Sequence, residues 1–238
     1  MDKKVWYISG ASKGLGLALT HKLLMQGYRV AATSRLLPAL VEATGGNTIE
    51  NFLPLEVDLS SERSIADSLR TTWETFGRID VVVNNASLNA LTHTVIPQAM
   101  PFLRRQGQGY IIDISPITGS VDSSPIAENI DIAPIAAGVM DEASSRGIRR
   151  TTVALGAFRT QFLKAEVHAS NGMYVSIDGR QSGDPQKAAS ALIRLPAMPE
   201  PPALLVLDSD AYRRAAIKAM EFEEQLERGP RLLCRVAR

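Results

Sequence analysis

The chain has 238 residues, 45% of them hydrophobic, and a formal net charge of +1. This composition is typical of a globular protein with a sizeable core, and it argues against a strongly basic nucleic-acid binder or an acidic disordered tail. The single cysteine, Cys234, excludes an internal disulfide framework and indicates a reducing compartment. The first residues, "MDKKVWYISG", hold no signal-peptide core, and no apolar run approaches the length of a membrane span. We therefore expect a cytoplasmic protein with neither nucleic acid nor membrane as a partner.

Strand-like and helix-like segments alternate along the chain. Strands are expected at 5–9, 28–34, within 51–60, 79–87, 110–115, within 149–158 and at the start of 201–228. Helices are expected at 14–25, 37–46, between Ser60 or Ser61 and Gly77, around 90–105, up to about 145, at 184–195 and over the rest of 201–228. Asp184 is expected to cap the helix that starts at Pro185.

This alternation predicts the fold class. Strands that alternate with helices form a parallel sheet with helices on both faces. We find no repeat, low-complexity tract or linker, so the expectation is one doubly wound α/β domain over residues 1–238, with about seven strands. Ligands of such sheets bind outside the carboxyl ends of the strands.

A glycine-rich turn follows the first strand. Its spacing, Ser9-Gly10-x-x-x-Gly14-x-Gly16, lies between a predicted strand and a predicted helix. Glycines there let the backbone approach a pyrophosphate, and the helix offers free N–H groups and a positive dipole end. The alternative is a tight turn that serves packing alone.

The turn resembles the T-G-x-x-x-G-x-G motif of the short-chain dehydrogenase/reductase family. "VVVNNAS" is similar to the N-N-A-G of that family, with Ser87 for glycine, and "VDLS", "GYIIDISPITG" and "TVALGAFRTQF" also resemble family segments. The resemblance covers nearly the whole chain and implies a Rossmann fold that transfers hydride between a nicotinamide and a carbonyl or alcohol. The cofactor residues that it implies are Gly10, Ser12, Lys13, Gly14, Leu15, Gly16, Asp58, Leu59, Asn84, Asn85 and Ala86.

The end of the second strand bears on which cofactor binds. An acidic residue there would accept the ribose hydroxyls of NAD, but the sequence reads "AATSR". Arg35 can pair with a 2′-phosphate, and Lys13 can assist. The expected cofactor is therefore NADP(H) rather than NAD(H). The alternative is that Arg35 is a solvated surface residue.

The groups that carry the family's chemistry are missing. The family uses a tyrosine as acid/base and a lysine four residues later that lowers the pKa of that tyrosine. No Tyr-x-x-x-Lys occurs in the chain, and no lysine lies between Lys22 and Lys164. Pro116 stands where the resemblance implies a catalytic serine, with Ser115 beside it, and Asn129 falls at the tyrosine position. The catalytic residues are thus unknown, with Ser115 and Asn129 as weak candidates.

Other reactive side chains have no placed partner in the sequence. We expect structural or surface roles for His21, His93 and His168, and solvated or capping roles for Asp113, Glu128 and Asp131, although those carboxylates lie where an unusual acid/base could act. No cluster has metal-ligand spacing.

Three functions remain open. The chain is an NADP(H)-dependent oxidoreductase with a substituted site, a degenerate dinucleotide-binding or interaction protein, or a non-redox cyclase, dehydratase or isomerase on the same fold. The substrate is a small molecule that the sequence does not identify. The family pairs subunits through the helices beside its fifth strand, and both look altered here, so a homodimer is one open alternative.

Overall fold

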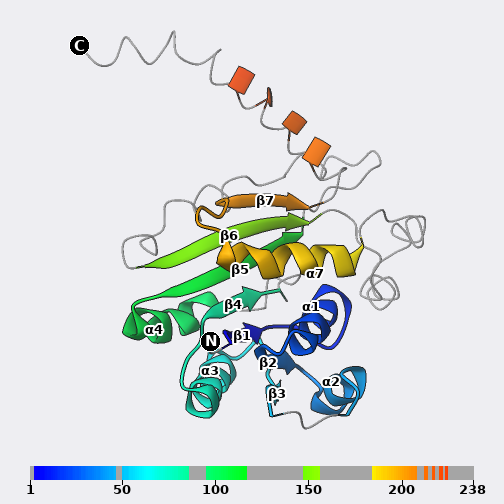
Figure 1. Ribbon diagram of the computed structural model, residues 1–238, viewed down its shortest axis with the longest axis vertical. Helices are drawn as coiled ribbons and strands as arrows, with labels where there is room; N and C mark the ends of the chain where they lie inside the picture. Colours follow the sequence, from blue (N-terminus) through cyan, green and yellow to red (C-terminus); the bar gives the residue numbers. More distant parts are fainter. Residues whose placement is uncertain are drawn as a thin grey trace.

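The computed structural model describes residues 3–46, 50–85, 95–116, 147–155 and 184–207, together with eight single positions between 212 and 224 (Figure 1). Its centre is a seven-stranded sheet with the order β3-β2-β1-β4-β5-β6-β7, and every neighbouring pair is parallel. The strands are β1 (Val5–Ile8), β2 (Arg29–Ser34), β3 (Phe52–Glu56), β4 (Val81–Asn84), β5 (Gly109–Pro116), β6 (Ile148–Leu155) and β7 (Leu204–Leu207).

Helices cover both faces of this sheet, which confirms the predicted fold class. On one face, α1 (Gly14–Met25), α2 (Leu37–Ala43) and α7 (Pro185–Arg194) contribute buried side chains to a cluster with Trp6 and Ile8. On the other face, α3 (Glu62–Phe76) and α4 (Ile96–Gln106) pack with Tyr7. Consecutive residues of β1 are buried on opposite faces, which is why the central strands read as continuous apolar runs.

The helix ends follow the sequence signals. Ser61, rather than Ser60, caps α3, because its side chain accepts a hydrogen bond from the amide of Ser64. Asp184 caps α7 by accepting one from the amide of Gln186, with Pro185 as the first helical residue. Gly77 ends α3 with a positive φ of 75°, a conformation that glycine adopts without steric cost.

Some expected segments lie partly or wholly outside the described residues. The helix expected around 90–105 is present as α4 from Ile96, and residues 90–94 are outside. The helix up to 145 is outside as well, and the last helix is described only at single helical positions. A short 3-10 helix, η3 (Leu195–Ala197), which the sequence did not predict, follows α7 directly. The assignment of residues 1–238 to one domain stays a prediction.

Candidate functional site

The glycine turn lies at the carboxyl end of β1, between the ends of β2 and β4. The amide of Ser9 donates to the carbonyl of Val83 at 3.0 Å, and the amide of Ala11 donates to the carbonyl of Thr33 at 2.8 Å. Gly10 has a φ of 66° and Gly14 a φ of 62°. Both values fall in the left-handed region, so the turn needs glycine at these two positions.

Asn85 fixes this turn from the β4 side. Its side-chain Nδ2 donates to the carbonyls of Ser9 and Gly10, both at 3.0 Å, and its backbone amide donates to Oγ of Ser9 at 2.9 Å. Gly16 lies against the same group, because a Cβ there would be 2.4 Å from the carbonyl oxygen of Gly10 and 2.8 Å from Nδ2 of Asn85. Gly16 therefore allows the first turn of α1 to approach the loop closely.

The N-terminus of α1 lacks the side-chain cap that α3 and α7 have, as do those of α2 and α4, but only α1 follows the glycine turn. Its N-cap, Lys13, makes no side-chain capping hydrogen bond, and no acidic residue occurs in the first turn. The first amides of a helix have no intrahelical acceptor, and they carry the positive end of the helix dipole. These features fit the pyrophosphate of a dinucleotide, which would take up amides of α1 next to Ser12 and Gly14, with Leu15 and Gly16 buried behind them.

The ends of β2 and β3 form the neighbouring part of this edge. Arg35 follows β2 and is exposed, and Asp58 follows β3. Hydrogen bonds from the hydroxyl and the amide of Ser60 lower the pKa of Asp58, and the charge of Arg35 contributes to the same shift. Leu59 packs against the α3–α4 face of the core. Arg35 and Asp58 thus lie at the same edge of the sheet, after β2 and β3.

Sequence reasoning missed one carboxylate at this edge. Glu56 is the last residue of β3 and pairs in register with Ser34, the last residue of β2. Its Oε2 accepts a hydrogen bond from the amide of Leu37, the first residue of α2, at 3.2 Å. The segment after β2 has no acidic residue, but β3 supplies one beside it. Only the order of strands in the sheet could have revealed it.

Asp113 takes part in an ion pair, which differs from the solvated or capping role expected for it. Its Oδ1 accepts from Nδ2 of Asn84 at 2.8 Å, and its Oδ2 accepts from Arg150 at 2.5 Å. Side chains of Asp113 and Arg150 are each 19% exposed. Because Asn84 and Arg150 engage both carboxylate oxygens, this geometry gives Asp113 a structural function rather than that of an acid/base.

The remaining candidates are placed only in part. His21 has the structural role expected, since its Nε2 lies 2.9 Å from the carbonyl of Ala43 at the end of α2. The backbone of Ser115 pairs with Ala154 of β6, but its side chain is outside the described residues. Fully outside are Ala86, Ser87, His93, Glu128, Asn129, Asp131 and His168. Within the described ranges, no three His, Cys, Asp or Glu side chains could hold a metal ion.

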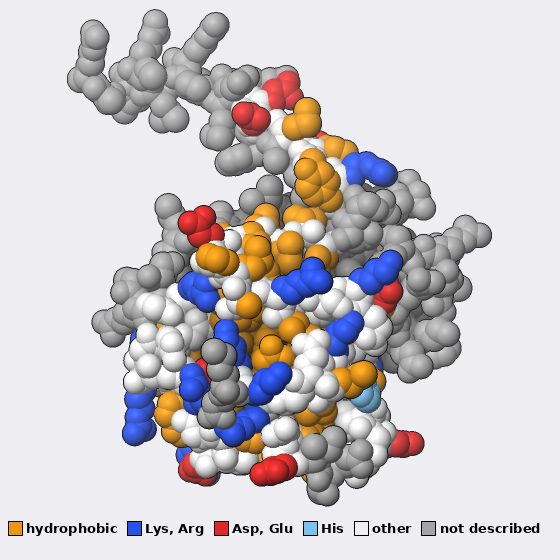
Figure 2. Space-filling view, viewed as in Figure 1, with side chains coloured by type: hydrophobic (Ala, Val, Ile, Leu, Met, Phe, Trp, Pro, Cys, Tyr) orange, Lys and Arg blue, Asp and Glu red, His pale blue; other side chains and the backbone are white. Residues whose placement is uncertain are grey.

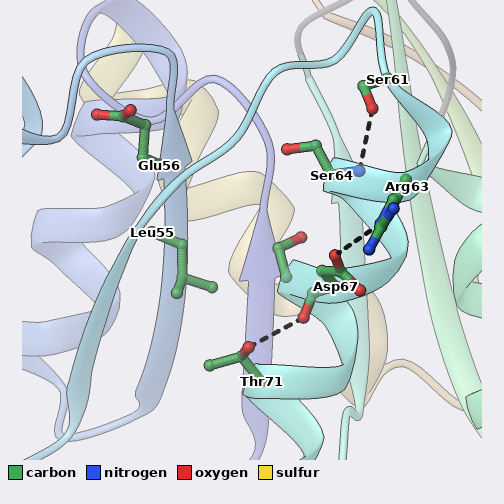
Figure 3. Close-up of a pocket in the computed structure, with 8 residues that line it drawn as sticks. Leu55, Glu56, Ser61, Arg63, Ser64, Asp67 and Thr71 are labelled. Carbon is green, nitrogen blue, oxygen red and sulfur yellow. Dashed lines mark hydrogen bonds and ion pairs between the residues drawn. The ribbon is translucent and has the colours of Figure 1, made fainter.

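A groove of about 400 Å³ lies between β3 and α3 (Figure 3). Most of its lining side chains are polar and belong to α3: Ser61 accepts from the amide of Ser64, Arg63 lies 3.8 Å from Asp67, and Thr71 donates to the carbonyl of Asp67. Because these groups bond within their own helix, they provide no candidate reactive group, and β3 contributes only Leu55 and Glu56 to the lining. The candidate site therefore remains the edge where β1, β2, β3 and β4 end.

The chain is similar to known oxidoreductases over most of its length. Residues 4–96 match the family model described as short chain dehydrogenase. An oxidoreductase of Botryotinia fuckeliana is 27% identical over 92% of this chain and 93% of its own. A short-chain dehydrogenase of Streptomyces avermitilis superposes with a TM-score of 0.71 and 24% identity, over 95% of this chain and 98% of that one.

An alcohol dehydrogenase of the archaeon Thermococcus sibiricus, solved with 5-hydroxy-NADP, superposes with a TM-score of 0.66 and 21% identity over 86% of this chain and 96% of that one. No helix in the described ranges is both long and apolar enough to cross a membrane. The match of residues 4–96, the relative that is similar over most of its length and the sheet order agree, and the chain is similar to short-chain dehydrogenases/reductases.

Proposed function

We propose that this chain binds NADP(H) at the edge where β1, β2 and β4 end. The observation that carries the proposal is the N-terminus of α1, which directly follows the glycine turn and has neither a side-chain cap nor an acidic residue in its first turn. A dinucleotide pyrophosphate is the anion that suits such a terminus in a parallel sheet. The Thermococcus sibiricus neighbour, solved with 5-hydroxy-NADP, supports the choice of ligand class.

The preference for NADP(H) rests on Arg35 and Lys13. A guanidinium binds a phosphate through two parallel hydrogen bonds, and a nearby ammonium adds charge without fixed geometry. Glu56 opposes this preference, because it places a carboxylate next to the end of β2. If Glu56 reached the ribose hydroxyls, the site would favour NAD(H) instead, so the two side chains make opposite predictions for the same experiment.

Titration of the purified protein with NADPH and NADH, followed by nicotinamide fluorescence, tests this proposal. We expect saturable binding of both, with NADPH tighter. Arg35→Ala should weaken NADPH binding by about tenfold, the loss expected for a charged hydrogen bond, and leave NADH unchanged. Arg63→Ala is the matched control, since Arg63 is 93% exposed on α3. No binding of either cofactor, or tighter NADH binding that Glu56→Gln abolishes, would overturn the proposal.

The reaction is a separate question, because the cofactor could be held without its usual chemistry. The sequence has no Tyr-x-x-x-Lys, and loss of general acid/base help alone costs roughly 10²–10⁴-fold in rate. We propose that the chain is, at most, a slow carbonyl or alcohol oxidoreductase. This same sequence feature favours the two alternatives, a cofactor-binding protein without turnover and a non-redox catalyst such as a cyclase, dehydratase or isomerase.

One assay distinguishes the three. The protein is mixed with stoichiometric NADPH and a panel of carbonyl compounds, and both the nicotinamide absorbance and the organic products are followed. Loss of absorbance with an alcohol product identifies the oxidoreductase. A converted substrate with unchanged absorbance identifies the non-redox catalyst, and no conversion with intact NADPH binding identifies the binding protein.

A further inference from the structure

The edge at which the strands begin, opposite the candidate site, is rich in cations. Helices end and strands start there, so the connections into β1, β2, β4, β5, β6 and β7 all meet at this edge. In Figure 2, Lys and Arg side chains are spread over the visible face, and several of them lie on the left, where β5 and β6 begin in Figure 1. The cations that these connections contribute are Lys3, Lys4, Arg29, Arg78, Arg104, Arg105, Arg149 and Arg194, which we call the basic edge.

Hydrogen bonds to backbone carbonyls place three of these cations on one surface. Lys3 Nζ donates to the carbonyl of Gln26, just after α1, at 2.7 Å. Lys4 Nζ donates to the carbonyl of Pro196 in η3 at 3.0 Å, and Arg149 donates to the same carbonyl at 3.2 Å. The end of α1, the start of β1, the start of β6 and η3 are therefore adjacent.

Part of this clustering of Lys and Arg is expected from helix structure, because the carbonyls at helix C-termini attract cations. They do not remove the net charge of the surface, because a backbone carbonyl is neutral. Carboxylates on the same connections balance only part of it: Asp80 is 8% exposed and lies 2.6 Å from Arg78, and the others in the described residues of these connections are Glu74, in the last turn of α3, and Glu200. The overall charge of +1 thus conceals an uneven distribution.

Exposed apolar side chains lie within the basic edge. Met25, next to Gln26, is 88% exposed, and Met198 is 40% exposed. The carbonyl of Met198 accepts from Arg149 at 2.9 Å, so the backbone of Met198 lies beside this guanidinium. Cations on long stems that alternate with solvent-exposed apolar side chains are typical of surfaces that rest on anionic lipid.

We propose that the basic edge docks on an anionic phospholipid surface. The cations pair with lipid phosphates and carboxylates, while Met25 and Met198 enter the headgroup region. A thioether gains by leaving water there and gains nothing at a nucleic-acid backbone, which favours lipid over DNA or RNA. This orientation leaves the candidate cofactor edge facing the solvent. It departs from the expectation of no membrane partner, which rested on net charge and on the lack of a long apolar run.

Co-sedimentation of the full chain with vesicles tests the proposal. Vesicles of phosphatidylcholine alone are compared with vesicles that contain phosphatidylserine, at low and high salt. We expect binding only to the phosphatidylserine vesicles and release by salt. The double variant Lys3→Glu/Arg105→Glu should bind at least about tenfold more weakly, given a several-fold contribution from each cation near a membrane. Arg63→Glu/Arg70→Glu on α3 is the control of equal charge change, and thermal unfolding confirms that each variant is folded.

Met25→Ser separates lipid from other polyanions. It should weaken vesicle binding and leave binding of a short DNA duplex unchanged. Equal binding to neutral vesicles, no binding to anionic ones, or equal losses in the Lys3/Arg105 and Arg63/Arg70 variants would overturn the proposal. The proposal would also be overturned if the protein bound the duplex more tightly than the vesicles at the same salt and Met25→Ser had no effect on vesicle binding. The occupant of the basic edge would then be a nucleic acid.

Discussion

Replacing Gly16 by alanine tests how tightly the glycine turn is built. The new Cβ would lie 2.4 Å from the carbonyl oxygen of Gly10 and 2.8 Å from Nδ2 of Asn85. Neither group can turn away cheaply, because one is backbone and the other donates two hydrogen bonds at 3.0 Å. Overpacking costs about 1–3 kcal/mol and each displaced hydrogen bond about 1 kcal/mol, while alanine gains about 1 kcal/mol over glycine within a helix. We therefore expect a net loss of about 1–3 kcal/mol.

Urea unfolding followed by circular dichroism measures this loss, with NADPH titration alongside because the turn is part of the candidate site. Gly109→Ala is the control: the nearest atoms to its Cβ would belong to the Leu103 side chain, at 2.8 Å, and not to the backbone or to a hydrogen-bonded group. This variant should lose less stability than Gly16→Ala and bind NADPH normally. A Gly16→Ala protein as stable as the wild type, or more stable, would refute the reasoning, since helix propensity would then outweigh the close approach.

Three other predictions concern charge. Burial raises the pKa of Tyr7 to about 12, whereas an unfolded tyrosine titrates near pH 10. The contribution of neutral Tyr7 to the free energy of unfolding is therefore fully present below about pH 10 and is lost as the pH rises toward 12. Tyr7→Phe should reduce the loss of stability that urea unfolding measures between about pH 9 and about pH 11. Glu56→Gln keeps an acceptor for the amide of Leu37 but removes a charge, so fluorescence titration at low salt should show NADPH binding tightened about threefold and NADH binding not tightened. Arg150→Met leaves the half-buried Asp113 without its guanidinium and should lower the free energy of unfolding, measured with urea, by about 1–3 kcal/mol. The double variant Arg150→Met/Asp113→Asn should recover most of this loss. If the double variant is as unstable as Arg150→Met alone, the ion pair is not the cause.

Local patterns were enough to locate most elements because their signals lie within a few residues. The apolar run Val81–Asn84 becomes a strand buried on both faces, and Asp184 with Pro185 marks the start of α7, as predicted. Boundaries that depend on a choice between neighbours, such as Ser60 or Ser61, needed the structure, because either side chain could have capped α3 and only its hydrogen bond decides.

The candidate site divides in the same way. The resemblance implied Asn85 as a cofactor residue, and the structure adds that its side-chain amide bonds to the glycine turn itself. Whether Asn85 also contacts a cofactor stays a prediction, as does the role of Arg35. Glu56 could not be found from the sequence, because its place beside the end of β2 depends on β3 being the edge strand next to β2.

The sequence by itself determined the alternating elements, the glycine turn and the absence of a Tyr-x-x-x-Lys motif, since each is a matter of residue type and spacing along the chain. Only the tertiary structure decided which groups meet: Asp113 with Asn84 and Arg150, Glu56 with the end of β2, and Lys4 and Arg149 at the carbonyl of Pro196. These contacts join residues far apart in sequence, and a local pattern carries no information about the strand order that brings them together.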